Sequence, residues 1–393
     1  MKITLDPKVH RFIFATAFIA ALGIGTSASA QQRPYLVDLN SKTATDIGTL
    51  GGTGLHDRTT AHGMNDNGEV VGVSTTAGRE LHAFITGPHG TGMRDLGTLG
   101  GTYSEAFGIN DTGQVVGFFS PAGISHDQHA FITGPNGAGM RDLGTLGGTS
   151  YSVASGINDA GQVVGTSNKP GGGGLRHAFI TGANGMGLRD LGTLGDYDHS
   201  SALAINEAGQ VVGDSVADGF THAFITGPNG MGMRDLGTLG HQQSWANDIN
   251  DAGQVVGWSH VGGSPQEFGS PHAFITGPNG MGMRDLGTLG GTESIALGIN
   301  EAGQVVGLSQ TADGSSHAFI TGPNGTGMMD LNSLVDLPVG VILQEATAIN
   351  NAGLVVVVAI PEPETYMLLL SGLALVGFIA RRKKMGGEAV SLG

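Results

Sequence analysis

The sequence predicts an all-β protein, a β-propeller of about seven four-stranded blades built from repeats of 44–50 residues. Three observations predict this fold: one unit recurs almost verbatim, glycine is abundant while charge is sparse, and the two ends of the array supply complementary parts of one unit. The repeated asparagine falls at Asn65, Asn110, Asn158, Asn206, Asn250, Asn300 and Asn350. A His-Ala-Phe motif recurs at His82, His129, His177, His222, His272 and His317.

Composition limits the class of protein and of partner. With 71 glycines in 393 residues and only 13% charged residues, the chain is poorly suited to a helical bundle and well suited to short strands joined by tight turns. Its formal net charge of −15 argues against nucleic acid and against an anionic membrane surface as partners. There is no cysteine, so burial and backbone pairing must supply the stability that disulfides give many secreted proteins.

One repeat reads as four short strands separated by turn residues. Each strand is rich in apolar residues, and the turns Asn300–Gly303 and Gly322–Gly325 suit tight antiparallel hairpins. The predicted strands, named a to d, are Ile295–Ile299, Gln304–Ser309, His317–Thr321 and Met328–Leu334. The unit is therefore a meander that must stack on copies of itself to bury its faces.

The ends of the array favour a ring over an open solenoid. The last copy, Ala346–Val358, supplies only strands a and b, and the segments Pro34–Leu39 and Thr45–Leu50 supply only c and d. Together they would complete one blade, whereas a solenoid would need polar caps. We predict a ring closed by a blade split between the two ends.

The meander also sorts the loops. The a–b and c–d turns share one edge and hardly vary, while the b–c loops and the links between blades lie on the opposite edge and vary strongly. Variation confined to one face indicates a scaffold face and a possible binding face. The residues that depart most from the repeat on that face form a possible ligand site: Tyr197, His199, Trp245, Glu267 and Phe268. Trp258 is similar, although it lies beside strand b and could belong to the core.

The repeated ionisable residues are expected to be structural. One histidine per blade would be spread around a ring, so His272 is expected to bond to a neighbour such as Asp285 instead of sharing a metal. Of each pair such as Arg234 and Asp235, one side chain is expected to be solvated and the other to act as an internal acceptor. The Asn-Asp-x-Gly turns lack the alternating carboxylates of a calcium loop. We predict no cofactor, no metal and no catalytic residue.

The two termini read as targeting segments. Residues 1–30 have a basic start, an apolar run and the A-x-A cleavage pattern of a signal peptide at Ala28 and Ala30. After the repeat domain, residues 31–360, come a Pro-Glu-Pro motif, an apolar transmembrane segment at 366–380 and a basic cluster, followed by a short tail, 385–393. The sorting-signal residues are Pro361, Glu362, Pro363, Arg381, Arg382, Lys383 and Lys384.

Segment 361–384 resembles the PEP-CTERM sorting signal of Gram-negative, exopolysaccharide-producing bacteria. The resemblance implies export across the inner membrane, transient anchoring there and processing by an exosortase-type membrane transpeptidase; a plain C-terminal anchor helix is the alternative. The His-Ala-Phe units resemble the extracellular HAF-repeat family, secreted bacterial proteins without an assigned activity.

Three functions remain open on the sequence. The first is a non-enzymatic protein at the cell surface or in the extracellular matrix, presenting a propeller to envelope proteins or polysaccharide in a biofilm. The second is a carbohydrate-binding module that uses the variable face. The third is a glycoside hydrolase whose carboxylates would include Asp198 or Glu267.

Overall fold

A computed structural model describes residues 32–54, 57–122, 127–148, 150–170, 175–195, 197–262 and 269–361. Gln32–Ile360 is one compact unit, close to the predicted repeat domain. The predicted signal peptide, the sorting residues beyond Pro361, and the ligand-face residues Glu267 and Phe268 lie outside the described residues. So does the predicted transmembrane segment 366–380; among the residues that are described, no helix has the length and apolarity needed to cross a bilayer.

The described chain is all-β, and its strands form antiparallel meanders of four. The first meander is β3 (Thr59–Met64), β4 (Val70–Thr75), β5 (Leu81–Ile85) and β6 (Arg94–Gly97). The second is β7 (Tyr103–Ile109), β8 (Val115–Ser120), β9 (His129–Ile132) and β10 (Arg141–Gly144). One parallel pair, Leu81 with Tyr103, joins the two. Next come β11 (Ser152–Ile157), β12 (Val163–Asn168), β13 (Arg176–Thr181), β14 (Leu188–Gly192) and β15 (Ser200–Ile205), β16 (Val211–Ala217), β17 (Phe220–Gly227), β18 (Met231–Asp235). Then follow β19 (Ser244–Ile249), β20 (Val255–Val261), β21 (Ser270–Gly277), β22 (Met281–Asp285) and β23 (Gly290–Ile299), β24 (Val305–Thr311), β25 (Ser316–Gly322), β26 (Thr326–Asp330).

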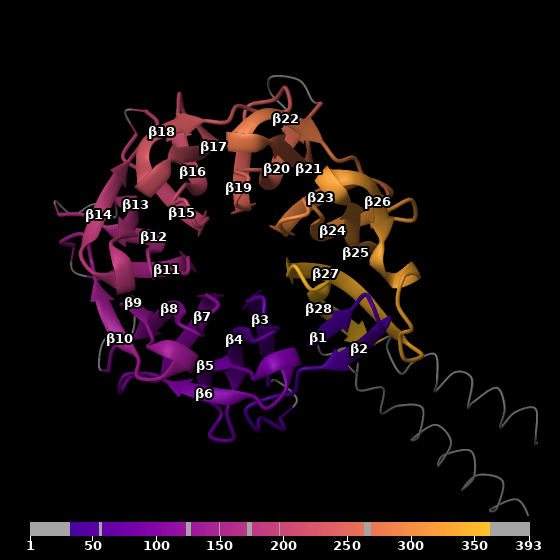
Figure 1. The fold of residues 1–393 in the computed structure, drawn as a ribbon, viewed down its shortest axis with the longest axis horizontal. Helices are drawn as coiled ribbons and strands as arrows, with labels where there is room; N and C mark the ends of the chain where they lie inside the picture. The colour runs from indigo at the N-terminus through magenta and orange to yellow at the C-terminus, as the bar shows by residue number, and fades with distance from the viewer. Residues whose placement is uncertain are drawn as a thin grey trace, which may run out of the picture. The chain divides into compact units, whose positions relative to one another are not determined.

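The two ends of the repeat domain meet in one sheet, as predicted from their complementary parts. Its order is β2 (Thr43–Asp46), β1 (Arg33–Asp38), β28 (Leu354–Pro361), β27 (Val341–Ile349). Strands β1 and β28 pair antiparallel from Arg33 with Ala359 to Asp38 with Leu354. Figure 1 shows these sheets side by side in a propeller-like arrangement, with the first strand of each meander nearest the centre.

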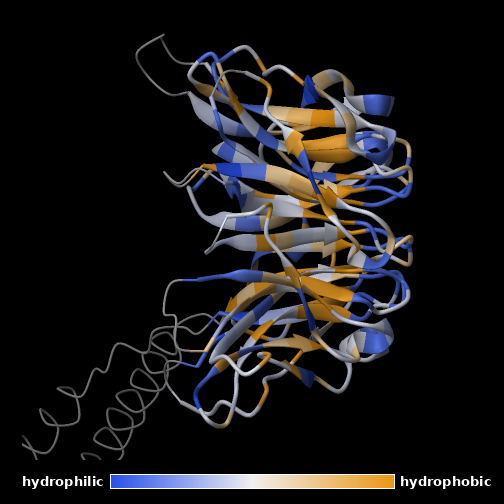
Figure 2. Cartoon of the chain, turned by 90° about the vertical axis from the view of Figure 1, so that its left-hand side faces the viewer, coloured by the Kyte–Doolittle hydropathy of each residue, from blue (hydrophilic) through white to orange (hydrophobic). Residues whose placement is uncertain are grey.

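Strand b of each meander is buried on both sides because a neighbouring sheet covers each face. In β4, for example, every residue is buried, and Figure 2 shows apolar residues along the strands with hydrophilic residues in the connecting turns. The repeated Val-Val-Gly glycine has a steric cause. A Cβ on Gly257 would lie 1.9 Å from the Trp245 carbonyl oxygen, so only glycine allows strand a to bulge against strand b here.

The predicted strands agree with the structure, except at strand d. Predicted as Met328–Leu334, it is observed as β26, and the chain then turns into a 3-10 segment at Leu331–Ser333. The cause is the Asp330 carboxylate, which accepts the Asn332 backbone N–H and ends the strand. The predicted d strand at Thr45–Leu50 is likewise shorter, and β2 ends at Asp46, whose carboxylate accepts the Gly48 N–H.

The c–d turns are short 3-10 segments in which the residue before the last glycine is left-handed, with φ near 54° at Asn279. Asparagine tolerates this conformation better than most residues. The a–b and c–d turns share an edge, as predicted, because the Gly280 N–H donates to the Gly253 carbonyl oxygen at 2.8 Å. These segments are Pro88–Gly90, Pro135–Gly137, Ala183–Gly185, Pro228–Gly230, Pro278–Gly280 and Pro323–Gly325.

The repeated asparagine joins each sheet to the next. Its Oδ1 accepts a backbone N–H of its own hairpin, and its Nδ2 donates to the carbonyl oxygen of the next repeated asparagine, as Asn250 does to Asn300 at 3.2 Å. The other donor–acceptor pairs, at 3.1–3.3 Å, are Asn65–Asn110, Asn110–Asn158, Asn158–Asn206, Asn206–Asn250, Asn300–Asn350 and Asn350–Asn65. This side chain therefore links neighbouring sheets all along the repeat domain.

The repeated histidines form hydrogen bonds, as predicted, and their partners lie in their own sheet. The His272 Nδ1 lies 2.9 Å from the Asp285 carboxylate, which also accepts the Gly287 N–H at 2.7 Å. The same pair recurs in His82–Asp95, His129–Asp142, His177–Asp190, His222–Asp235 and His317–Asp330. The repeated arginines are exposed, as a solvated side chain would be, but they also link neighbouring sheets. Arg234, for example, donates to the Asn279 carbonyl oxygen of the next sheet at 2.7 Å.

Replacing Asn250 with alanine should lower the free energy of unfolding by about 3 kcal/mol, because the buried Gln254 N–H and Asn300 carbonyl oxygen lose their partner. Denaturant unfolding of the variant measures this loss. Ala252→Ser, an exposed change in the same turn, is the control and should be neutral. Equal stability of Asn250→Ala and the control would contradict the proposed role of the asparagine.

Candidate functional site

The channel at the centre of the unit is lined by the first strand of each meander. A register shift in that strand, between Ala61 and Gly63 in β3, leaves one residue unpaired, and such bulges redirect a side chain. The bulged residue lies three positions before each repeated asparagine and faces the channel. The residues at this position are His62, Phe107, Ser155, Leu203, Asn247, Leu297 and Thr347. The scaffold residues repeat, but the residue at this channel-facing position does not.

Two cavities follow one another along the channel. The mouth cavity, of about 480 Å³, is lined by residues from the beginning of the inner strands, such as Tyr151, Val153 and Glu345. The inner cavity, of about 280 Å³, reaches residues from their ends, such as Ile109 and Asp248. Because the inner strands run from the variable loops towards the a–b turns, the mouth cavity lies at the variable-loop end.

One side of the channel carries a hydrogen-bonded group of ionisable side chains. The buried Glu105 carboxylate lies 2.8 Å from His62 Nε2 and 3.5 Å from Arg58, and it accepts the Tyr103 hydroxyl. Burial alone would raise the pKa of Glu105, but the hydrogen bonds from His62 and Tyr103 and the Arg58 charge hold it below its ordinary value. Burial and the bond to Glu105 raise the pKa of Tyr103. The negative charge of Glu105 is therefore stabilised by its hydrogen bonds and by the Arg58 guanidinium.

Aromatic rings surround this group. The His62 and Phe107 ring centroids lie 5.1 Å apart, and the Phe118 ring stacks against Phe107 at 5.9 Å and against Tyr103 at 5.4 Å. Further around the mouth cavity, the Arg176 guanidinium lies 3.7 Å from the centre of the Tyr151 ring, a cation–π contact that holds this ring in place.

Glu345 differs from Glu105 because no cationic side chain that the structure describes is bonded to it. It lines the mouth cavity from β27, is half-buried, and forms no hydrogen bond or ion pair with any other residue that the structure describes. Burial raises the pKa of Glu345, and the nearby His62 opposes that shift only in part. A carboxylate in this position offers its acceptor oxygens to whatever enters the cavity.

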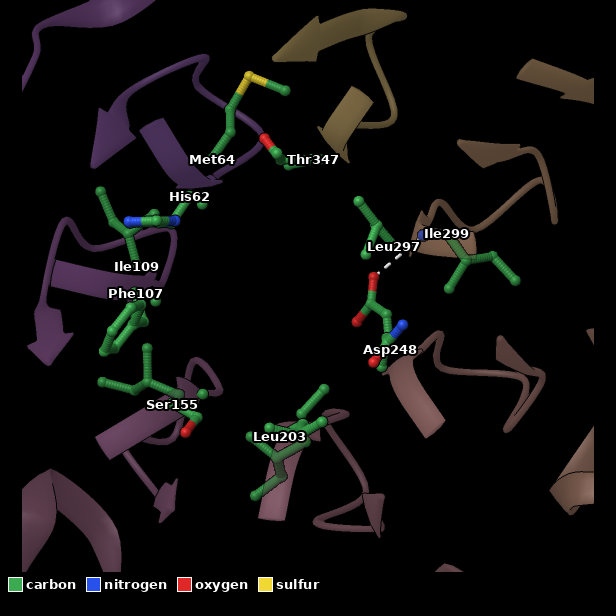
Figure 3. A pocket seen from close by; sticks show the side chains of 18 of the residues that line it. His62, Met64, Phe107, Ile109, Ser155, Leu203, Asp248, Leu297, Ile299 and Thr347 are labelled. Carbon is green, nitrogen blue, oxygen red and sulfur yellow. Dashed lines mark hydrogen bonds between the residues drawn. The ribbon is translucent and has the colours of Figure 1, made fainter. Parts of the chain in front are cut away.

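Asp248 occupies a position that is glycine or alanine elsewhere: Gly63, Gly108, Gly156, Ala204, Gly298 and Ala348. The position is tight, since a Cβ on Gly63 would lie 2.5 Å from a carbonyl oxygen of the next sheet. The Asp248 carboxylate reaches the next sheet and accepts the Ile299 N–H at 3.0 Å, the bond drawn in Figure 3. Burial raises the pKa of Asp248 to about 7, helped by the Glu301 charge and opposed by the backbone donors Ile299 and Ile249.

Of the ligand site that the sequence suggested, the structure describes Tyr197, His199 and Trp245. Tyr197 is exposed, and none of Tyr197, His199 and Trp245 lines either channel cavity. Trp245 instead stacks on Trp258, with ring centroids 3.9 Å apart, because the two residues are register partners in β19 and β20. Burial, and then the Arg176 charge, lower the pKa of His199.

Asp198, a carboxylate suggested for hydrolysis, is held in ion pairs. His177 Nε2 lies 3.1 Å from it and the Lys169 Nζ 3.4 Å, and these bonds lower its pKa. The channel residues His62, Glu345 and Asp248, and Glu105 behind His62, were missed. They could have been found by aligning the repeats and asking where a channel-facing position departs from its counterparts.

Comparison with known families identifies a motif in one segment of the chain. The chain carries a PEP-CTERM protein-sorting motif at residues 359–384. This motif suggests an exported protein that is sorted at the membrane by an exosortase, as the tail predicted. The match does not reach the repeats, and the resemblance to the HAF-repeat family stays a prediction. No curated protein matches the chain.

Solved structures similar to this chain include propellers. A mutant of puromycin hydrolase complexed with PGG is 12% identical, with a TM-score of 0.51 over 77% of this chain and 52% of that one, so the chain spans about half of it. A putative TolB from Agrobacterium tumefaciens is 10% identical, with a TM-score of 0.47 over 74% and 98% of the two chains. The β-propeller domain of the Trilobed protease from Pyrococcus furiosus is 10% identical, with a TM-score of 0.38 over 70% and 95%. At these identities only the fold is shared.

Asp248→Asn should change how stability depends on pH. With its pKa near 7 in the folded protein and about 3.8 in the unfolded chain, Asp248 binds more protons when folded between these values, so its contribution to stability falls as pH rises through that window. The difference in unfolding free energy, wild type minus variant, should therefore fall by roughly 3 to 4 kcal/mol from pH 4 to pH 7.5. Denaturant unfolding across this range measures it, and a constant difference would contradict the assignment.

Proposed function

We propose that this protein is a non-enzymatic binding protein, displayed at the cell surface or in the extracellular matrix of a Gram-negative bacterium, that holds matrix polysaccharide at the mouth of its channel. The observation that carries the proposal is the mouth cavity. In a chain whose scaffold residues repeat almost without change, the side chains around this cavity differ from strand to strand. A non-repeating site on a repeating scaffold is what selective binding of one ligand requires.

The lining suits sugar better than an apolar ligand. Phe107 and Tyr151 offer ring faces, while Glu345, Asn247 and Ser201 offer oxygen acceptors for hydroxyl groups. The cavity, of about 480 Å³, lies within the roughly 300–1,000 Å³ range of small-molecule sites. It lies at the variable-loop end, so the face predicted for binding is retained although the residues differ.

The sorting tail supports a location outside the cell for the repeat domain. A PEP-CTERM motif is processed by an exosortase, and we propose cleavage near Pro361–Pro363 after transient anchoring in the inner membrane by 366–380 and the basic residues 381–384. Release would place the repeat domain outside the cell, in an exopolysaccharide-rich biofilm. Envelope proteins are the alternative partners.

The absence of catalysis is part of the proposal. Glycoside hydrolysis uses two carboxylates, one of them a general acid with a raised pKa. Glu105 and Asp198 are each engaged by cationic partners that lower their pKa. Glu345 is the one carboxylate among the described residues that line the mouth cavity, and Asp248 lies in the inner cavity bonded to the Ile299 N–H, which favours binding over hydrolysis.

We further propose a ring of seven blades closed by the blade that both ends share. The pairing of β1 with β28 supports it. So does the asparagine series, because Asn350 donates to the Asn65 carbonyl oxygen at 3.3 Å, in the same way as its counterparts. Pairing of the two ends covers the edge of β28 that would otherwise be left unpaired.

Deleting residues 31–52 tests the closure. Removing β1 and β2 exposes the apolar edge of β28, so the shortened protein should unfold at a lower temperature in one cooperative transition and be digested throughout by protease. Calorimetry and limited proteolysis beside the intact protein measure this. If only the end frays while the other repeats keep their stability, the array is open and linear.

Blocking the mouth cavity tests the binding proposal. Leu203→Trp fills part of the cavity, so retardation of the protein in gels containing the purified exopolysaccharide of its host should be lost. Tyr197→Ala, outside the cavity, should leave retardation unchanged, and the far-ultraviolet spectrum confirms that both variants are folded. Equal retardation of both variants, or release of reducing ends from the polysaccharide, would contradict the proposed function.

A further inference from the structure

We propose that the mouth cavity selects an amino sugar with a free ammonium group, such as a glucosamine residue within a polysaccharide, and that Glu345 is the residue that pairs with this group. The inference rests on the proposed binding function and names the chemical class of the ligand.

The first argument is the state of Glu345. A carboxylate withdrawn from bulk water loses solvation that an opposite charge can restore. Within the described residues no such charge is bonded to Glu345, although it lines a cavity large enough for a ligand. A ligand ammonium would supply both the charge and the hydrogen-bond donors that the carboxylate lacks.

The second argument is that the nearby cationic groups are bonded elsewhere. His62 and Arg58 both bond to Glu105, at 2.8 and 3.5 Å, and His62 opposes the pKa shift of Glu345 only in part. The Arg176 guanidinium lies over the Tyr151 ring. The next ionisable group down the channel is the acidic Asp248 of the inner cavity. Among the described residues, no cationic side chain is therefore bonded to Glu345.

The third argument is the polarity of the remaining lining. Asn247 donates its Nδ2 to the Ala296 carbonyl oxygen at 2.7 Å, which leaves its Oδ1 as an acceptor. Phe107 adds an aromatic face, on which the C–H groups of a pyranose and an attached ammonium are both favourable. Acceptors, an aromatic face and one carboxylate without a bonded cation fit an amino sugar better than a neutral or acidic sugar.

Three tetrasaccharides separate the possibilities: glucosamine tetramer, its N-acetylated counterpart and cellotetraose. They share the β-1,4-linked backbone and differ at the C2 substituent. Isothermal titration of the full-length wild-type protein should show glucosamine tetramer binding at least tenfold more tightly than the other two at pH 6.5, with the preference falling as salt is raised. Glu345→Gln should remove the preference, and Glu80→Gln, an exposed loop carboxylate, should not.

The outcomes are distinguishable. Equal binding of all three sugars by the wild type would overturn the ammonium inference and leave the sugar-binding function standing. A preference for the glucosamine tetramer that survives in Glu345→Gln would overturn the role of Glu345. No binding of any of the three sugars would overturn the amino-sugar inference, while retardation by the exopolysaccharide of the host would still support the proposed function. The wild-type comparison decides even if Glu345→Gln fails to fold.

Discussion

The hydrogen bond from each repeated asparagine to the next repeat is the interaction on which the rest of this structure depends. It is made by a buried amide that also fixes its own hairpin, so one residue type sets both the turn and the spacing to the neighbouring sheet. The His–Asp pairs and the Val-Val-Gly glycines complete the scaffold inside each sheet. Because these contacts lie away from the channel-facing positions, those positions can vary without loss of the fold.

This separation of scaffold from lining explains where the unusual residues are found. Glu105 and Glu345 stand at corresponding positions of two inner strands, yet Glu105 is bonded to His62, Tyr103 and Arg58, whereas Glu345 is bonded to no residue that the structure describes. Asp248 replaces a small residue at a tight contact and becomes a bond between sheets. The repeat thus gives a regular frame in which single substitutions create local chemistry.

Much of the fold could be predicted because repetition shows which residues are structural. The period of the apolar residues and the placement of glycine predict the strands and the turns, and with them the edge that the turns share and the pairing of the two ends. The fixed spacing of His272 and Asp285 predicts the bond between them. The site could not be predicted in the same way. A bulge reverses the alternation of side chains within the inner strand, so the face of His62 or Leu203 cannot be assigned from period alone.

The tryptophans show how tertiary pairing changes the interpretation of a conspicuous residue. Trp245 and Trp258 stand out in the sequence, and their cross-strand register makes them stacking partners for each other. This contact gives both rings a structural role that the sequence alone did not indicate. Glu345 is ordinary in the sequence and distinctive only once its surroundings are known.

Hydrogen–deuterium exchange with and without bound polysaccharide tests most directly whether the channel is where this protein meets its ligand. The account predicts slower exchange in the inner strands that line the mouth cavity, notably β27, β3, β7 and β11, and no change in outer strands such as β6 and β18. Protection confined to the variable loops around residue 197 or to the outer strands, with the inner strands unchanged, would contradict it.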